Sequence, residues 1–194
     1  VKPSQIINVR KIKHLITGNL DEKIYTNPFY FDSEKIYLRG QIARINASCT
    51  LAPKGLHRFV EESTRDIEDN TPEDGPIKMP VPAALCSLDS WVHLTPSLLK
   101  QGKTKQSEPK PGSGDEEVDS EELMKREVAK DPWEPRLKPI AKDNATKGGM
   151  PPWVIKSFNI SKTDGVVVVR SLWWPGSYTI YANGRSQHIY VGDA

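Results

Sequence analysis

The side chains best suited to catalysis or metal binding are sparse in this chain of 194 residues. It has four histidines, and none of them has a cysteine, an acidic residue or a second histidine at the spacing of metal ligands. They are His14, His57, His93 and His188. The sequence therefore predicts no metal site and no bound cofactor.

The two cysteines, Cys49 and Cys86, lie among apolar or small residues in segments typical of helices. A secreted disulfide scaffold would contain more cysteines. No activating base accompanies Cys86, as a nucleophilic thiol would require. We therefore expect two buried thiols in a reducing compartment.

Three patterns that carry enzymatic chemistry are missing: the dinucleotide-binding GxGxxG, the phosphate-binding GxxxxGKS or GxxxxGKT, and the nucleophile elbow GxSxG. A hydrolase stays open as an alternative, because two catalytic carboxylates can be distant in sequence. Nearly all acidic residues, however, fall within two polar insertions, which are poor supports for a preorganised site. We predict that the chain is not an enzyme.

The first insertion, residues 61–79, carries seven acidic and two basic residues. Its alternating Asp66, Glu68 and Asn70 begin like a calcium-binding loop. An EF-hand requires glycine at the sixth position and glutamate at the twelfth, and these are Thr71 and Ile77 here. The insertion is therefore predicted to be an acidic surface loop.

Two helices are predicted in residues 1–60. The first begins at Pro3 and ends at Gly18, because apolar residues recur at helical spacing and glycine readily adopts a left-handed cap. The second ends at Pro53. Gly40 inside it costs up to about 1 kcal/mol relative to alanine, so we expect a close neighbour there.

The middle of the chain is predicted to contain little regular structure. Residues 80–102 regain apolar character and indicate a short helix. Residues 103–149 are too polar to offset the entropy of ordering and are predicted to be a disordered insertion.

Residues 150–194 show the period of two that is typical of strands, with turns around Thr163–Gly165 and Asn183–Gly184. The predicted fold class is α+β, with N-terminal helices packed on a C-terminal antiparallel β-meander and a long polar, partly disordered insertion. Residues 1–194 are expected to be a single-domain fragment of a longer protein, since the chain starts on Val1.

The predicted sheet carries more aromatic residues than a core of this size needs. Neighbouring tryptophans on a strand face opposite ways, so one is expected to enter the core and the other to meet a partner, where aromatic residues dominate binding energy. We predict a dimer or partner interface at Trp173, Trp174, Tyr178, Tyr181 and Tyr190.

The alternative function is nucleic-acid binding through the basic first helix and the Trp173–Trp174 pair. It requires basic residues among the aromatic ones, and the sheet offers only Arg170 and Arg185. A protein partner is therefore favoured, and no nucleic acid is expected. No membrane is expected either, because the longest aliphatic run, Val166–Val169, is far shorter than the roughly 20 residues of a membrane span.

The chain resembles the family of radial spoke head proteins 4 and 6 between Gln5 and Gly192. The segments that carry the resemblance occur in the family's order: RKIKHLITGNLD, YLRGQIARINASCTLAPKGLHRF, DSWVHL, PPWVIKS, VVVVRSLWWPGSY and IYVG. Polar insertions separate them at the same two places. Lysine is mixed into these insertions here, whereas family members carry nearly pure glutamate runs.

The resemblance implies a non-enzymatic scaffold in the cytoplasm, within the cytoskeleton of the ciliary or flagellar axoneme. It implies a homodimer or pairing with a paralogue, contact with other radial spoke head and stalk subunits, and transient contact with central pair projections. It also implies a part in relaying mechanical signals from the central pair apparatus to the dynein arms.

Overall fold

The structure is a computed structural model that describes residues 1–30, 32–61, 66–73, 75–104, 136–144, 148–161 and 164–192. The chain forms two compact units. The helical unit comprises Val1–Arg44 and Pro96–Glu134, and the sheet unit comprises Ile45–Thr95 and Pro135–Ala194. Within the described residues, no helix has the length and apolar character needed to cross a bilayer.

The helical unit contains α1 (Pro3–Val9) and most of α2 (Glu34–Cys49). The prediction that the first helix reaches Gly18 is wrong. Beyond Val9 the backbone takes a different path, on which the N–H groups of Thr17 and Gly18 both donate to the Glu34 carboxylate at 2.9 Å. A buried carboxylate thus replaces the helical hydrogen bonds that periodicity had predicted.

Gly40 allows α1 and α2 to approach closely. A Cβ atom at this position would lie 2.7 Å from Val9 Cγ2, closer than real side chains come. Val9 is fully buried at this contact. The expectation of a close neighbour at Gly40 is confirmed.

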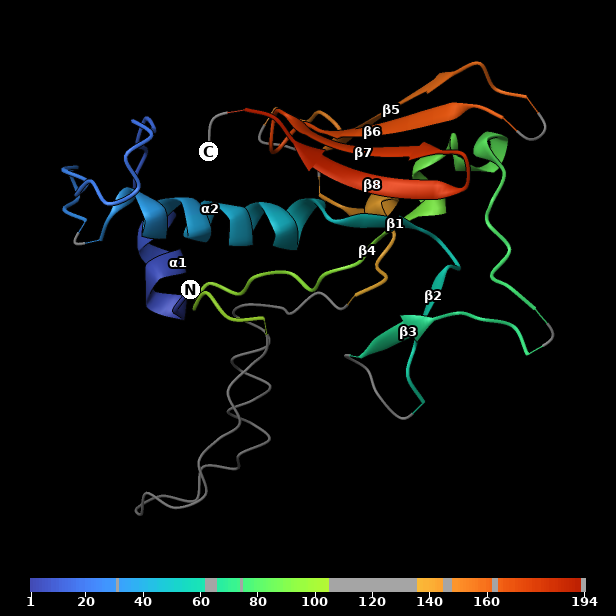
Figure 1. Ribbon diagram of the computed structural model, residues 1–194, viewed down its shortest axis with the longest axis horizontal. Coiled ribbons are helices and arrows are strands. Elements are labelled where there is room, and N and C mark those ends of the chain that lie inside the picture. The colour runs from blue at the N-terminus through green and yellow to red at the C-terminus, as the bar shows by residue number, and fades with distance from the viewer. Residues whose placement is uncertain are drawn as a thin grey trace, which may run out of the picture. The chain divides into compact units, whose positions relative to one another are not determined.

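The sheet unit is built on a four-stranded antiparallel sheet with the strand order β5-β6-β7-β8 (Figure 1). Its strands are β5 (Trp153–Phe158), β6 (Val166–Ser171), β7 (Ser177–Ala182) and β8 (Arg185–Tyr190). Asn183 and Gly184 join the last two with positive φ angles of 49° and 70°, as a tight hairpin of the primed type requires. The predicted meander and the α+β class are confirmed.

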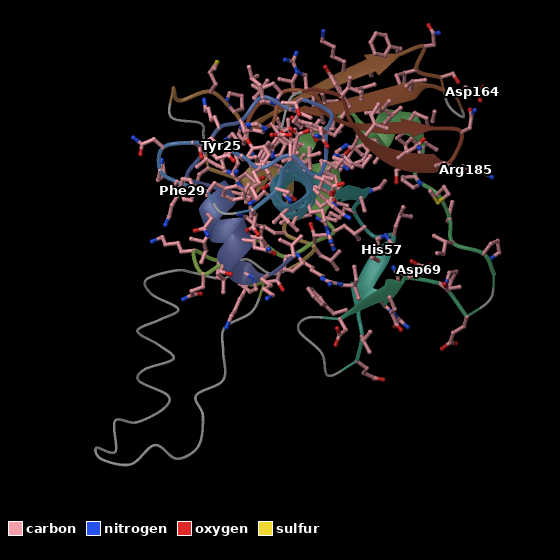
Figure 2. The ribbon with its side chains drawn as sticks, turned by 60° about the vertical axis from the view of Figure 1, so that its left-hand side comes forward. Tyr25, Phe29, His57, Asp69, Asp164 and Arg185 are labelled. Atoms are coloured by element: carbon pink, nitrogen blue, oxygen red, sulfur yellow. The ribbon has the colours of Figure 1, made fainter. Side chains whose placement is uncertain are left out.

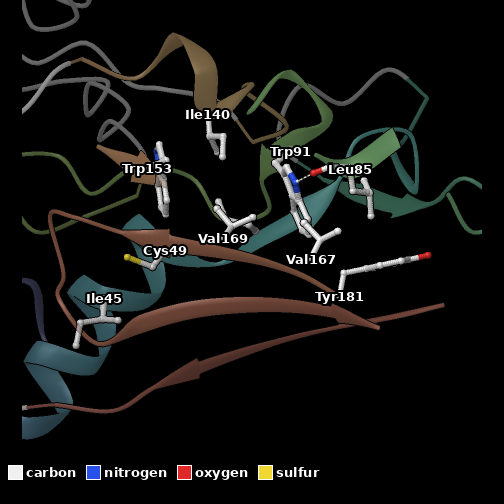
Figure 3. Close-up of a cluster of buried hydrophobic side chains, with 10 residues drawn as sticks. Ile45, Cys49, Leu85, Trp91, Ile140, Trp153, Val167, Val169 and Tyr181 are labelled. Atoms are coloured by element: carbon white, nitrogen blue, oxygen red, sulfur yellow. Dashed lines mark hydrogen bonds between the residues drawn. The ribbon is translucent and has the colours of Figure 1, made fainter. Parts of the chain in front are cut away.

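One face of this sheet, the inner face, covers the core of the sheet unit (Figure 3). Trp91 is fully buried there, and its indole N–H donates to the Leu85 carbonyl at 2.9 Å. The last turn of α2 contributes Ile45 and Cys49 to the same cluster. The other members are Leu51, Ile140, Trp153, Val167, Val169 and Tyr181.

Short elements complete the sheet unit, and they differ from the predicted helix at residues 80–102. The chain there forms two 3₁₀ turns and one strand, β4, which pairs with β1 in an antiparallel manner. A second small hairpin, β2 with β3, extends into the predicted acidic loop. The elements are β1 (Leu51–Pro53), β2 (His57–Phe59), β3 (Ile67–Asp69), η1 (Pro82–Leu85), η2 (Leu88–Ser90), β4 (Trp91–His93) and η3 (Ile140–Lys142).

The prediction of disorder over 103–149 is wrong for residues 136–144. The Asp143 carboxylate accepts hydrogen bonds from Trp153 Nε1 at 2.7 Å and pairs with His93 Nε2 at 2.8 Å and Lys138 Nζ at 3.2 Å. These contacts, together with buried Ile140, hold the segment against the core. Residues 105–135 and 145–147 lie outside the described part of the chain.

The cysteines also differ from expectation. Both are free; Cys49 is buried as predicted, but Cys86 is exposed. Cys86 directly follows the η1 turn, and its thiol donates to the Pro82 carbonyl at 3.6 Å.

Candidate interaction surface

The tryptophan pair occupies the bend between β6 and β7 and is not part of either strand. Trp173 exposes 50% of its surface, whereas Trp174 is half-buried and packs against the core of the sheet unit. The Trp174 N–H donates to Ser171 Oγ at 3.2 Å, and its carbonyl accepts from the Ser177 N–H at 2.9 Å. The bend itself therefore divides the two indoles between core and surface.

Gly176 fixes this bend against the end of β8. The Val191 N–H donates to the Gly176 carbonyl at 2.8 Å, and a Cβ atom on Gly176 would overlap the Val191 carbonyl. Its φ of +100° also favours glycine. The exposed side chains of Trp173 and Val191 thus project from neighbouring segments at this end of the sheet.

Tyr181 does not belong to an exposed interface. It is 1% exposed, and its hydroxyl donates to the Pro80 carbonyl. Burial raises the pKa of this phenol. Tyr190 is half-buried against the same core, and Tyr178 lies half-buried on the opposite face of the sheet. The five predicted interface residues therefore do not share one surface. Tyr181 and Tyr190 lie on the inner face of the sheet, Tyr178 lies on the opposite face, and the two tryptophans lie in the bend.

The face opposite the core, the outer sheet face, is a broader apolar surface. Strand register places twelve residues on it, and each is half-buried or exposed. Eight of the twelve are apolar: Val154, Phe158, Val166, Val168, Tyr178, Ile180, Ala182 and Ile189. Four are polar: Lys156, Arg170, Arg185 and Gln187. Arg185 is the first residue of β8, directly after the turn of the β7–β8 hairpin (Figure 2).

Of the five predicted interface residues, only Tyr178 lies on this face. The signal for the rest was the run Val166–Val169, because alternation sends Val167 and Val169 inward and leaves Val166 and Val168 outward. Antiparallel sheets with one solvated face normally alternate apolar and polar residues. Here the outer face is mostly apolar as well, which departs from that alternation.

A buried polar cluster lies under the tryptophan bend. Ser177 Oγ and His188 Nε2 are 2.9 Å apart, and burial lowers the pKa of His188. Ser177 is 2% exposed, so its hydroxyl cannot reach a substrate from solution. Burial likewise raises the pKa of the Cys49 thiol, which disfavours the reactive thiolate. The Ser177–His188 contact connects β7 and β8.

Three histidines pair with acidic residues that sequence spacing did not reveal. His14 meets Glu34 at 3.1 Å, and His57 meets Asp69 at 3.0 Å across the β2–β3 hairpin (Figure 2). His93 meets Asp143, fifty positions further along the chain. Each pair joins one histidine to one acidic residue. No group of three or more potential metal ligands occurs among the described residues.

The whole chain, residues 1–194, matches the radial spokehead-like protein family. The chain belongs to this family, so the resemblance noted from the sequence is confirmed.

Individual relatives agree with the family match. The chain is 35% identical over 210 residues to radial spoke head protein 6 homolog A of Mus musculus. It is 36% identical over 206 residues to the Xenopus tropicalis protein of the same name, and 31% identical over 199 residues to flagellar radial spoke protein 4 of Chlamydomonas reinhardtii. Each match covers 99% of this chain but only 29%, 39% and 40% of the respective relative. The chain thus spans well under half the length of these relatives.

Proposed function

We propose that the chain is a non-catalytic structural subunit of the radial spoke head that helps to relay mechanical signals between the central pair apparatus and the dynein arms. Family membership makes it a radial spoke component of cilia and flagella, within the axonemal cytoskeleton. A scaffold role is supported by the inaccessibility of the Ser177 hydroxyl and the Cys49 thiol, two groups that could otherwise act as nucleophiles.

The main support for this proposal is the apolar character of the outer sheet face. Exposed apolar patches of this kind mark association sites in soluble proteins. The central row runs Lys156–Val168–Ile180–Gln187, so polar residues flank an apolar centre. Protein interfaces commonly have this arrangement, with an apolar core inside a polar rim.

The proposed occupant of the outer sheet face is a second copy of this chain or a close paralogue. Two such faces can pack as a sandwich, in which apolar side chains from the facing sheets interdigitate at about 10 Å spacing. The exposed indole of Trp173 lies at the end of the same sheet and extends the contact. Other spoke subunits and the central pair would meet the remaining surfaces.

Val168→Glu tests this proposal because it places a charge at the centre of the outer sheet face. Gln187→Glu is the matched control, since it adds the same charge at the edge of the same row. In sedimentation velocity at roughly 50 μM, the unmodified chain and the control are expected to dimerise, and Val168→Glu to weaken dimerisation by tenfold or more. Circular dichroism checks that both variants are folded.

A monomeric unmodified chain, or an equally dimeric Val168→Glu variant, would overturn the interface. The cellular role has its own readout. A tagged chain expressed in a cell with motile cilia is expected along the axoneme, and diffuse cytoplasmic signal would contradict the assignment to the spoke.

A further inference from the structure

The charged positions of the outer sheet face all carry the same sign. Strand register arranges its twelve residues in three rows of four: Val154–Arg170–Tyr178–Ile189, Lys156–Val168–Ile180–Gln187 and Phe158–Val166–Ala182–Arg185. Lys156 and Arg185 lie on the edge strands, and Arg170 lies in an outer row. All three side chains are exposed, and none of the twelve residues is Asp or Glu. The rim of this face is therefore cationic.

The three cations of this rim are not neutralised by the chain's own acidic residues. In the described part of the chain, Lys156, Arg170 and Arg185 take part in no ion pair and no side-chain hydrogen bond. Asp164 lies in the turn before β6, at the same end of the sheet as Arg185, but does not pair with it (Figure 2). Soluble surfaces usually intersperse both signs, so the anions that match this rim have to come from a partner.

Two of the cations are also close to each other. Lys156 pairs in register with Val168, and Arg170 pairs with Val154, so the two cations are diagonal neighbours on adjacent strands. Diagonal neighbours on one face of an antiparallel pair are about 7–8 Å apart. The Debye length at physiological salt is about 8 Å, so their repulsion is only partly screened. A carboxylate placed between them by a partner would relieve it.

We propose that the outer sheet face binds a protein surface that is apolar at its centre and acidic at its rim, in preference to an identical copy of itself. This inference rests on the proposed function, in which the outer sheet face is an interface. Two identical faces oppose three cations to three cations, and like charges at an interface lower affinity. An identical copy meets only the apolar half of the requirement, so the homodimer is the weaker complex.

The centre of the face determines the class of partner. Val168 and Ile180 occupy the middle of the three rows, with apolar neighbours in the outer rows. A nucleic acid contacts proteins largely through its phosphates, and would leave these apolar side chains without apolar contacts. A protein surface can cover them and also supply carboxylates, to which arginine donates two parallel hydrogen bonds.

A charge-reversed copy of the chain, Lys156→Glu/Arg170→Glu/Arg185→Glu, keeps the apolar centre and makes the rim acidic, so it serves as the probe. The unmodified chain is labelled with a fluorophore and titrated with unlabelled unmodified chain or with this variant, and anisotropy reports binding. The variant is expected to bind at least about tenfold more tightly than the unmodified chain. An increase in NaCl from about 50 to about 300 mM should weaken the mixed complex and strengthen the homodimer, because it screens attraction in one and repulsion in the other.

The matched control is Lys54→Glu/Lys78→Glu/Lys142→Glu. It makes the same change in net charge at three exposed lysines of the sheet unit, on segments that contribute to the core under the inner face. Its affinity for the labelled chain is expected to stay within about twofold of the unmodified value. Circular dichroism checks that the variants are folded. Lys156→Glu/Arg185→Glu, which changes only exposed positions on the edge strands, keeps the test valid if the triple variant is unfolded.

The outcomes separate the charge preference from the interface itself. Equal affinity of the labelled chain for the unmodified chain and for the charge-reversed variant would overturn the preference, while the outer sheet face would remain an interface. An equal gain in the control variant would mean that net charge alone attracts the partner, and would also overturn it. Absence of binding in every mixture up to roughly 50 μM would contradict the interface, and with it both proposals for this face.

Discussion

The two units of the chain differ in the balance between apolar burial and polar contacts. The core of the sheet unit joins aromatic and aliphatic residues from strands, turns and the end of α2. The core of the helical unit is smaller, with Val9, Ile12, Ile24, Tyr30 and Tyr37, and buried Glu34 and Gln41 lie in the same unit. Both units use directed hydrogen bonds, to Glu34 in the helical unit and to Asp143 in the sheet unit. The helical unit has the smaller apolar cluster and therefore depends on such bonds more.

The polar groups of the helical unit form a connected network. Tyr37 Oη accepts from Gln41 Nε2 at 2.8 Å and from the His14 N–H at 3.3 Å. The neighbouring Tyr30 hydroxyl is buried without a hydrogen-bond partner in the described part of the chain, and burial raises its pKa to about 12. Such networks specify one geometry but tolerate little change, because an unpaired buried polar group is costly.

The largest expected effect is in the apolar core of the sheet unit. Trp91→Ala removes a fully buried side chain and its hydrogen bond, and is expected to lower the free energy of unfolding by about 3–5 kcal/mol. Trp173→Ala is the matched control, because Trp173 is half exposed, and should cost about 1 kcal/mol or less. Urea unfolding measures both. Similar costs for the two variants would contradict the assignment of Trp91 to the core and Trp173 to the surface.

A smaller effect is expected where the two helices of the helical unit meet. Gly40→Ala gains up to about 1 kcal/mol of helix propensity, but its methyl group would overlap Val9 Cγ2. Overpacking of a rigid, β-branched neighbour costs about 1–3 kcal/mol, so urea unfolding should show net destabilisation. In a chain that already carries Val9→Ala the overlap is removed. There Gly40→Ala should increase stability relative to Val9→Ala alone. A Gly40→Ala chain that is more stable than the unmodified chain would contradict the close contact.

Local patterns in the sequence were sufficient for the sheet. Alternation and turn residues located four strands and the Asn183–Gly184 hairpin, because antiparallel neighbours are joined by short turns. The unusual glycine in α2 correctly indicated a close contact at Gly40. Alternation along β7 also puts Tyr181 and Tyr178 on opposite faces, but alternation alone does not show which face the core covers.

Contacts between distant positions explain what the sequence did not reveal. The periodic pattern predicts a first helix that continues to Gly18. It cannot show that the Glu34 carboxylate accepts hydrogen bonds from the N–H groups of Thr17 and Gly18, seventeen and sixteen residues earlier. Residues 136–144 looked too polar to order, but Asp143 pairs with His93 fifty positions away. In both places a buried carboxylate determines the local backbone, and no periodicity reports such a partner.

The smallest expected effect on the stability of the whole chain comes from Glu34. The same residue gives the most direct test of the difference between the two units. The pKa of Glu34 is lowered from 4.5 to about 2, first by the hydrogen bond from the Thr17 N–H and further by His14, Gly18 and the Thr17 hydroxyl, while burial opposes the shift. The depressed pKa means that this carboxylate stabilises the fold fully above pH 4.5. Its contribution is lost as the pH falls from 4.5 to about 2.

Two-dimensional NMR of the Thr17 and Gly18 amides from pH 6 to about pH 1 measures this directly. Both signals should move with a midpoint near pH 2 in the unmodified chain, because protonation of Glu34 removes the charge that they bind. In Glu34→Gln the transition should disappear, whereas Glu22→Gln, an exposed carboxylate on the same loop, should leave it unchanged. A midpoint near 4.5, the ordinary value for glutamate, would mean that the carboxylate is solvated and that the loop is not held by it. The helical unit would then be stabilised by its apolar cluster, like the sheet unit, and the contrast between the two units would not hold.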